Sequence, residues 1–304
     1  MNHENPGTKT LLLNGSSGST GLVNLIESFK KLGPSFGLNI SAYIPSFSEL
    51  INRPISIKEY PLVAQKLNHL DAEKIVVFGG RRTALVLEEV IPDVKKSIGL
   101  VPVTVENDLW ACERSLGFSS AVEFAFRNYQ DRDIYHNDQS DILILEIAGH
   151  ESGFLVLETG MALGAQTLVF PENPETADMI AKKYKIFRQK SSDGKISRFL
   201  VVVNEGISPG RSFDLAENLR KAHGLNPEVV IIAPMQRHCH ANAEDVLLAA
   251  KYSAKCCEYL SQGKSGFMVG YSNGKFNAVD VTSVAQELKK PALGLLRLAR
   301  ELYC

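Results

Sequence analysis

Two carboxylates close to the end of an apolar segment are the side chains in this sequence best suited to proton transfer. The segment Val101-Pro-Val-Thr-Val-Glu-Asn-Asp-Leu109 alternates valines and then presents Glu106 and Asp108. This pattern predicts a short buried strand that ends in a polar tip. Two carboxylates on one tip can divide the work, because one can accept a proton while the other holds a cation or a hydroxyl group. A strand that simply ends in a polar turn explains the same residues.

A loop of small residues near the start of the chain could bind an anion. Asn14-Gly-Ser-Ser-Gly-Ser-Thr-Gly21 lies between an apolar strand and a periodic helix, roughly Leu22 to Leu32. A loop that leads into a helix can direct backbone N–H groups at an anion. The loop lacks the lysine of a nucleotide-binding P-loop, so that interpretation fails. A tight turn between strand and helix is the alternative.

A second glycine turn carries two arginines. Lys74-Ile-Val-Val-Phe-Gly-Gly-Arg-Arg-Thr83 predicts a strand, a turn and the beginning of a helix. Two arginines at a helix N-terminus place positive charge on the positive end of the helix dipole. An anion bound there would compensate for this charge, and arginines that extend into solvent are the alternative.

The rest of the chain shows how these residues are positioned. Apolar segments alternate with helix-periodic segments along the whole sequence, which predicts an α/β fold with parallel sheets. Polar residues recur at the predicted strand tips: Arg81, Glu106, His150, Glu205 and Arg237. Side chains at the carboxyl ends of parallel strands line a binding crevice. A zinc site at His238-Cys-His240 is not expected, because no second ligand pair accompanies it.

The composition limits the classes of function. The chain has 304 residues, 33 basic and 34 acidic, and a formal net charge of -1. This balance gives no reason to expect a nucleic acid or an anionic membrane as partner. No apolar run approaches the roughly 20 residues of a membrane span, and the beginning of the chain lacks an export pattern. Five cysteines without paired spacing suggest reduced thiols and a cytoplasmic location.

The order of the strand-tip motifs resembles that of the 6-phosphofructokinase family, from Leu11 to the end of the chain. The family's Gly-Gly-Asp turn corresponds to Gly79-Gly-Arg-Arg-Thr83, and its Pro-Lys-Thr-Ile-Asp-Asn-Asp motif to Pro102-Val-Thr-Val-Glu-Asn-Asp108. Its Gly-Phe-Asp-Thr-Ala helix start corresponds to Gly117-Phe-Ser-Ser-Ala121, and its Met-Gly-Arg segment to Ala148-Gly-His150. Its Glu-Gly tip and its Gln-Arg-Gly-Gly turn correspond to Glu205-Gly206 and to Gln236-Arg-His-Cys239.

The resemblance implies two Rossmann-like α/β lobes with parallel-rich sheets and an active-site cleft between the lobes. It places the donor-side lobe at residues 1–118 plus about 236–287, and the acceptor-side lobe at 119–235 plus about 288–304. Members transfer a phosphoryl group from MgATP or pyrophosphate to fructose 6-phosphate. They form their sugar site across a subunit contact, so a homodimer or homotetramer is expected.

The resemblance also implies roles for single residues. Glu106 takes the position of the first aspartate of the family motif, which is the general base. Asp108 takes the position of the second aspartate of that motif. The residues implied for acceptor binding are Thr104, Gly149, His150, Glu205 and Arg237. The residues implied for binding the donor or another anion are Gly15, Ser16, Gly79, Gly80, Arg81, Arg82 and Thr83.

Several positions depart from the family pattern. Arg81 replaces the aspartate that helps to hold Mg²⁺, and a cation cannot ligate a cation. Mg²⁺ is therefore a candidate cofactor whose binding the Arg81 substitution disfavours. Asp108 is the remaining candidate ligand. Two arginines that bind the 6-phosphate group align with Asp141 and Glu228, and the family's histidine aligns with Pro234. Carboxylates in place of the arginines would repel a phosphate group.

Three functions are compatible with these observations. The first is a divergent phosphotransferase that uses ATP or pyrophosphate and a sugar or sugar-like hydroxyl other than that of fructose 6-phosphate. The second is a non-catalytic homologue that senses a ligand, or that pairs with an active paralogue as a regulatory or structural subunit. The third is an ordinary 6-phosphofructokinase, which requires the alignments of Asp141 and Glu228 to be wrong.

Overall fold

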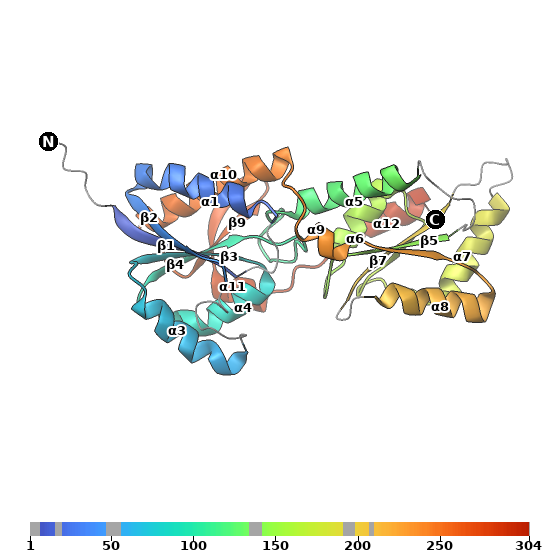
Figure 1. Ribbon diagram of the computed structural model, residues 1–304, viewed down its shortest axis with the longest axis horizontal. Coiled ribbons are helices and arrows are strands. Elements are labelled where there is room, and N and C mark those ends of the chain that lie inside the picture. The colour runs from blue at the N-terminus through green and yellow to red at the C-terminus, as the bar shows by residue number, and fades with distance from the viewer. Residues whose placement is uncertain are drawn as a thin grey trace. The chain divides into compact units, whose positions relative to one another are not determined.

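The chain forms two compact units, each of which contains its own β-sheet (Figure 1). The computed structural model describes residues 7–15, 20–46, 56–133, 142–190, 198–206 and 210–303. Unit 1 consists of Met1–Ser119 and His240–Lys289, and unit 2 consists of Ser120–Cys239 and Lys290–Cys304. The α/β fold with mainly parallel sheets that the sequence predicts is confirmed.

Unit 1 contains a six-stranded sheet in the order β10-β9-β4-β3-β1-β2. Its strands are β1 (Thr8–Asn14), β2 (Leu38–Ile44), β3 (Lys74–Gly79), β4 (Ser97–Pro102), β9 (Phe267–Ser272) and β10 (Lys275–Asp280). All neighbouring strands are parallel except β9 and β10, which form a hairpin. Its helices are α1 (Leu22–Leu32), α3 (Tyr60–His69), α4 (Arg81–Val90), α10 (Ala243–Ser261) and α11 (Val281–Gln286).

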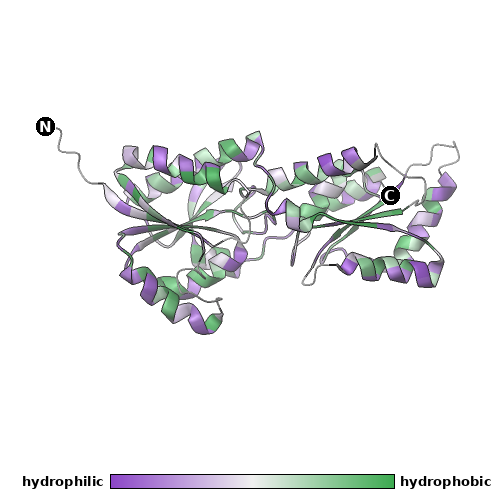
Figure 2. Ribbon diagram, viewed as in Figure 1, coloured by the Kyte–Doolittle hydropathy of each residue, from purple (hydrophilic) through white to green (hydrophobic). Residues whose placement is uncertain are grey.

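Helices cover both faces of this sheet, and the strand sequences show why. Leu11 and Leu13 of β1 belong to the core beneath α3, α4 and α11, whereas Leu12 belongs to the core beneath α1 and α10. Successive side chains of a strand point to opposite faces, so a strand covered on both faces must be apolar throughout. Figure 2 shows long green stretches in the strands and alternating green and purple in the helices, as expected for helices with one buried face.

Unit 2 contains a four-stranded parallel sheet in the order β6-β7-β5-β8. Its strands are β5 (Ile142–Ile147), β6 (Thr167–Val169), β7 (Phe199–Asn204) and β8 (Glu228–Ile231). Its helices are α5 (Phe118–Asp133), which begins in unit 1, α6 (Phe154–Leu163), α7 (Ala177–Lys190), α8 (Arg211–His223), α9 (Ala233–Gln236) and α12 (Leu293–Tyr303). Helices α7 and α8 bury apolar side chains against β5 and β7.

The strand predicted from the alternating valines was wrong in its extent. Strand β4 begins at Ser97 and ends at Pro102, and Val103 contributes only an isolated bridge to Leu116. Alternation marks a strand with one buried face, but β4 is buried on both faces and therefore has a continuous apolar pattern. The predicted tip at Pro234–His240 is helical in its first part, because α9 occupies Ala233–Gln236.

None of the helices in the described part of the chain combines the length and the apolar character that crossing a membrane requires.

Candidate functional site

Three strand ends of unit 1 bring the predicted donor and catalytic residues to one edge of the sheet. Strands β4, β3 and β1 are parallel neighbours, with Gly79 paired to Pro102 and Asn14 paired to Phe78. The segments that come after them therefore leave the sheet on the same side. Gly15, the turn at Gly79 and the loop after Pro102 lie at this edge, as the sequence predicts. Ser16 lies outside the described residues.

Close packing explains the glycine pair after β3. A Cβ atom on Gly79 would lie 2.1 Å from the Thr83 hydroxyl oxygen, and one on Gly80 would lie 3.0 Å from the Thr104 Cβ atom. The Thr83 hydroxyl donates a hydrogen bond of 2.8 Å to the Gly15 carbonyl, and the Gly15 N–H donates to the Phe78 carbonyl at 2.6 Å. These two donors of the predicted anion site are thus bound to the protein itself.

Arg81 makes its contacts at the end of another helix. Its Nη1 atom donates to the carbonyl oxygens of Ala285 and Glu287, at 3.1 and 3.2 Å. These carbonyls lie at the C-terminus of α11, where a helix has acceptors without internal partners and favours a cation. Arg82 is exposed on the first turn of α4. Arg81 therefore caps α11, an arrangement that neither interpretation from the sequence included.

The loop after β4 is held by Thr104. The Thr104 hydroxyl accepts a hydrogen bond from the Glu106 N–H at 3.1 Å, and the Thr104 backbone N–H donates to the Leu116 carbonyl at 3.0 Å. The Ser115 hydroxyl donates to the Thr104 carbonyl at 2.7 Å. Threonine bonds of this kind fix the turn that carries Glu106 and Asp108.

Asn107 gives this loop an unusual backbone conformation. Its φ of 53° lies in the left-handed region, which asparagine tolerates better than most side chains. Its side chain is buried, accepts from the Ser115 N–H at 2.9 Å and donates to the Glu113 carbonyl at 2.9 Å. The side-chain bonds therefore hold the turn that separates the two carboxylates.

Asp108 is the group in this loop with an unsatisfied atom. Its Oδ1 atom is buried and has no hydrogen-bond partner among the described residues. Burial, with a smaller contribution from the Glu106 carboxylate, raises the pKa of Asp108 to about 6. Its own backbone and the positive charges of Arg81 and Lys289 partly oppose this rise in the pKa. A carboxyl group that titrates near neutral pH is suited to proton transfer.

These residues do not fit a resident Mg²⁺ site. Glu106 and Asp108 supply carboxylates, but Arg81 and Lys289 already act on Asp108 with positive charge. Within the ranges that the structure describes, no cluster of three or more His, Cys, Asp or Glu side chains is placed to hold a metal ion. Mg²⁺ prefers several oxygen ligands in octahedral geometry.

Unit 2 brings its predicted acceptor residues together in the same way. Strands β7, β5 and β8 are parallel neighbours, and Gly149, Glu205 and Arg237 follow their carboxyl ends. The Arg237 guanidinium forms an ion pair with the buried Glu205 carboxylate. The Gly149 N–H donates to the same carboxylate at 3.4 Å. The cluster is therefore a charged pair at a strand edge, with His150 half-buried beside it.

Three further side chains form hydrogen bonds at this edge: Asn204, Arg211 and Gln236. The sequence motifs did not indicate a role for them in the site. The buried Asn204 amide donates to the His150 carbonyl at 3.2 Å, and its oxygen accepts from Arg211 Nη1 at 3.2 Å. Gln236 accepts from the Ala148 N–H at 2.8 Å and donates to the Ala121 carbonyl at 3.0 Å. Asn204 ends a continuous apolar strand and is the only polar residue in β7, which is the signal that could have identified it.

The two positions where carboxylates replace the family's arginines have different outcomes. Glu228 is the first residue of β8 and forms an ion pair with the buried side chain of Arg198. It lies at the amino end of its strand, at the edge of the sheet opposite Gly149 and Glu205. Asp141 lies outside the described residues.

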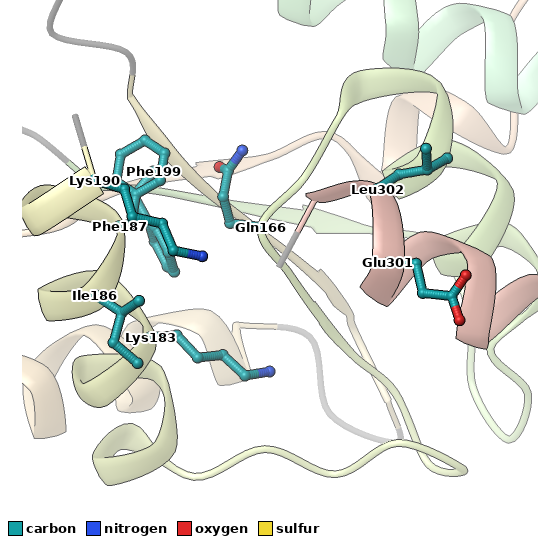
Figure 3. Close-up of a pocket in the computed structure, with 8 residues that line it drawn as sticks. All are labelled: Gln166, Lys183, Ile186, Phe187, Lys190, Phe199, Glu301 and Leu302. Carbon is teal, nitrogen blue, oxygen red and sulfur yellow. The ribbon is translucent and has the colours of Figure 1, made fainter. Parts of the chain in front are cut away.

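Unit 2 also contains a cavity of about 320 Å³ at the amino ends of its strands. Figure 3 shows its lining residues: Gln166, Lys183, Ile186, Phe187, Lys190, Phe199, Glu301 and Leu302. Helices α7 and α12 supply most of them, and the predicted site residues of unit 2 are not among them.

Comparison with known proteins identifies relatives of this chain. A family model described as phosphofructokinase matches residues 50–260. The ATP-dependent 6-phosphofructokinase 1 of Thermus thermophilus is 28% identical over 242 residues, which cover 78% of this chain and 72% of the relative. The pyrophosphate–fructose 6-phosphate 1-phosphotransferase of Thermoproteus tenax is 27% identical over 238 residues, which cover 73% and 69%.

A solved structure has the same fold. The pyrophosphate-dependent phosphofructokinase from Marinobacter aquaeolei matches with a TM-score of 0.77, over 94% of this chain and 86% of that chain. Its sequence identity is 17%, so this likeness concerns the fold alone.

Proposed function

Since this chain belongs to the phosphofructokinase family, we propose that it is a phosphotransferase that moves a phosphoryl group from ATP or pyrophosphate to a sugar or sugar-like hydroxyl. The half-buried Asp108, whose Oδ1 atom is fully buried, is the observation that carries this proposal, together with the nearby Glu106. Leaving a buried polar atom without a partner destabilises a protein, and such atoms call for an explanation such as catalysis or the binding of a ligand. Perturbed carboxyl groups likewise concentrate at functional sites.

Glu106 is the residue to which we assign the general base. The acceptor hydroxyl transfers its proton to the Glu106 carboxylate while its oxygen forms a bond to the phosphorus atom. The bond from phosphorus to the bridging oxygen of the donor breaks, and ADP or phosphate leaves. Asp108 supports the base electrostatically, because its negative charge above pH 6 makes Glu106 a better proton acceptor.

Arg81 and Lys289 supply positive charge at this edge of unit 1. Guanidinium and ammonium groups stabilise the charge of phosphoryl groups. We therefore propose that Arg81 takes part of the role that the family assigns to Mg²⁺.

The acceptor that we propose lacks the 6-phosphate group of fructose 6-phosphate. By motif order, Glu228 takes the position of an arginine that binds the 6-phosphate across the subunit contact in the family, and its carboxylate is paired with Arg198. Pro234 replaces a histidine and has no side-chain donor. Glu205 and Arg237 remain for the hydroxyl groups of a sugar.

A non-catalytic homologue is the second candidate, and the engaged donor-side groups favour it. Gly15, Arg81 and Thr83 donate hydrogen bonds to carbonyl oxygens of the protein. Such a protein would sense a ligand or act as the regulatory or structural partner of an active paralogue.

Phosphorus NMR distinguishes the two candidates. The protein is incubated with Mg²⁺, with ATP or pyrophosphate, and with fructose 6-phosphate or a pool of unphosphorylated sugars. We expect a new phosphomonoester from the sugar pool, and Glu106→Gln should slow its formation by about 10²- to 10⁴-fold. The exposed Glu89→Gln variant is the control and should retain the wild-type rate.

Fructose 1,6-bisphosphate as the product would show an ordinary 6-phosphofructokinase and contradict the proposed acceptor. The absence of product from every pair, with folded protein, would favour the non-catalytic candidate. Equal rates for Glu106→Gln and Glu89→Gln would contradict the assignment of the base.

A further inference from the structure

Lys289 is a charged residue in unit 1 that the sequence motifs did not indicate. It comes after α11 and is half-buried. Its Nζ atom donates a hydrogen bond of 2.7 Å to the backbone carbonyl of Asn107. Asn107 lies between the two carboxylate residues in the sequence, so Lys289 contacts the turn that separates Glu106 from Asp108.

The turn that Lys289 contacts contains a residue with a left-handed backbone conformation. Asn107 has a φ of 53°, a conformation that residues other than glycine seldom adopt. Its side chain is anchored on one side by Ser115 and Glu113. Its carbonyl is held on the other side by Lys289. Because Asp108 is the next residue, fixing the Asn107 peptide group also fixes the direction in which Asp108 leaves the turn.

Lys289 also belongs to a segment that Arg81 holds in place. Arg81 donates to the carbonyls of Ala285 and Glu287, four and two residues before Lys289. Arg81 thus connects α4 to the end of α11, and Lys289 connects the segment after α11 to the carboxylate loop. Both lower the pKa of Asp108, against burial and Glu106, which raise it.

We propose that Lys289 is a positioning residue for the carboxylate pair: its ammonium group holds the Asn107 carbonyl, orients Asp108 and balances the negative charge of the pair. This role rests on the proposed function, because orientation of the pair matters to the extent that the pair performs proton transfer. The role predicts effects on the loop that can be measured without turnover, and effects on turnover that a purely structural lysine would not cause.

The experiment compares Lys289→Met, Lys289→Arg and the control Lys290→Met, which alters the adjacent lysine. The first measurement is hydrogen exchange of the backbone amides in residues 104–109 of the full-length protein. Lys289→Met should accelerate their exchange by about tenfold or more, since a hydrogen bond to a charged group is lost. Lys289→Arg should retain most of the protection, and Lys290→Met should leave exchange unchanged.

The second measurement is the pH dependence of kcat/KM for phosphoryl transfer. Removal of the Lys289 charge should shift the acidic limb to higher pH by up to about one unit, because a cation that favours ionised Asp108 is gone. Displacement of the pair should lower kcat by about 100-fold. Lys289→Arg should restore the acidic limb to within a few tenths of a unit, and Lys290→Met should not move it.

The outcomes separate this proposal from the proposed function. If Lys289→Met exchanges residues 104–109 no faster than Lys290→Met does, the proposal is wrong. It is also wrong if kcat falls while Lys289→Arg restores neither exchange nor the pH profile. If the wild-type protein transfers no phosphoryl group, the proposed function fails, whereas the exchange data alone still decide whether Lys289 positions the loop.

Discussion

The carboxyl-end edges of the two sheets treat their acidic residues differently. In unit 2 the buried Glu205 carboxylate is paired with Arg237 and accepts a bond from Gly149. In unit 1 the half-buried Asp108 has a buried oxygen without a partner in the described residues, and nearby positive charge compensates for it only partly. The same fold therefore carries a satisfied ion pair at one such edge and an unsatisfied carboxyl at the other. The unsatisfied group is the stronger indication of chemistry.

The largest effect should come from breaking the ion pair of unit 2. Arg237→Met leaves the Glu205 carboxylate buried without its cation, which should lower the free energy of unfolding by about 3–5 kcal/mol. Urea unfolding measures this change. The double variant Arg237→Met/Glu205→Gln should recover much of the loss, because the uncompensated charge is removed. A loss below about 1 kcal/mol in the single variant would contradict the comparison.

Asp108→Asn should change the pH dependence of stability. The pKa of Asp108 is raised from 3.8 to about 6, so the native state retains a proton that the unfolded state releases between these values. Wild-type stability should therefore fall by up to about 3 kcal/mol as pH rises through this range. Asp108→Asn should lack this decrease. Urea unfolding at pH 4 and pH 7.5 tests it, with the exposed Asp93→Asn as control. Identical pH profiles for wild type and Asp108→Asn would refute the raised pKa.

Arg81 tests whether positive charge replaces a metal ion in unit 1. Arg81→Met removes the hydrogen bonds to the end of α11 and should destabilise unit 1 by about 2 kcal/mol. Arg81→Asp should in addition create or improve activity that depends on MgATP, because a carboxylate is a ligand for Mg²⁺. Mg²⁺ titration of both variants measures this. If the wild type already requires Mg²⁺ and Arg81→Asp changes nothing, the donor side has been misinterpreted.

Thr83→Val should have the smallest effect. It removes the hydroxyl that donates to the Gly15 carbonyl and should lower the free energy of unfolding by about 1 kcal/mol. Thr83→Ser keeps a hydroxyl that can donate this hydrogen bond and serves as the matched control. If Thr83→Val lowers kcat/KM more than tenfold while the free energy of unfolding falls by only about 1 kcal/mol, the hydroxyl contacts the phosphoryl donor and not only the Gly15 carbonyl.

Apolar periodicity was sufficient to predict which residues share an edge. The segments around Leu12, Val76 and Ile144 identified strands, and parallel pairing brings the loops after neighbouring strands to one side of the sheet. The placement of Gly79, Glu106, Glu205 and Arg237 after the carboxyl ends of their strands could therefore be predicted. The extent of β4 could not, because a strand buried on both faces lacks the alternation on which the prediction relied.

The sequence by itself determined the α/β class, the order of the strand tips and the residue types present at each tip. Only the tertiary structure decided what those side chains contact. Arg81 is bound by carbonyls 204 and 206 residues away, and Asn107 is held by Lys289 from 182 residues away. Strand formation follows local periodicity, whereas a long charged side chain takes whichever partner a distant segment places within reach. The pKa of Asp108 likewise depends on burial, which the assembled unit creates.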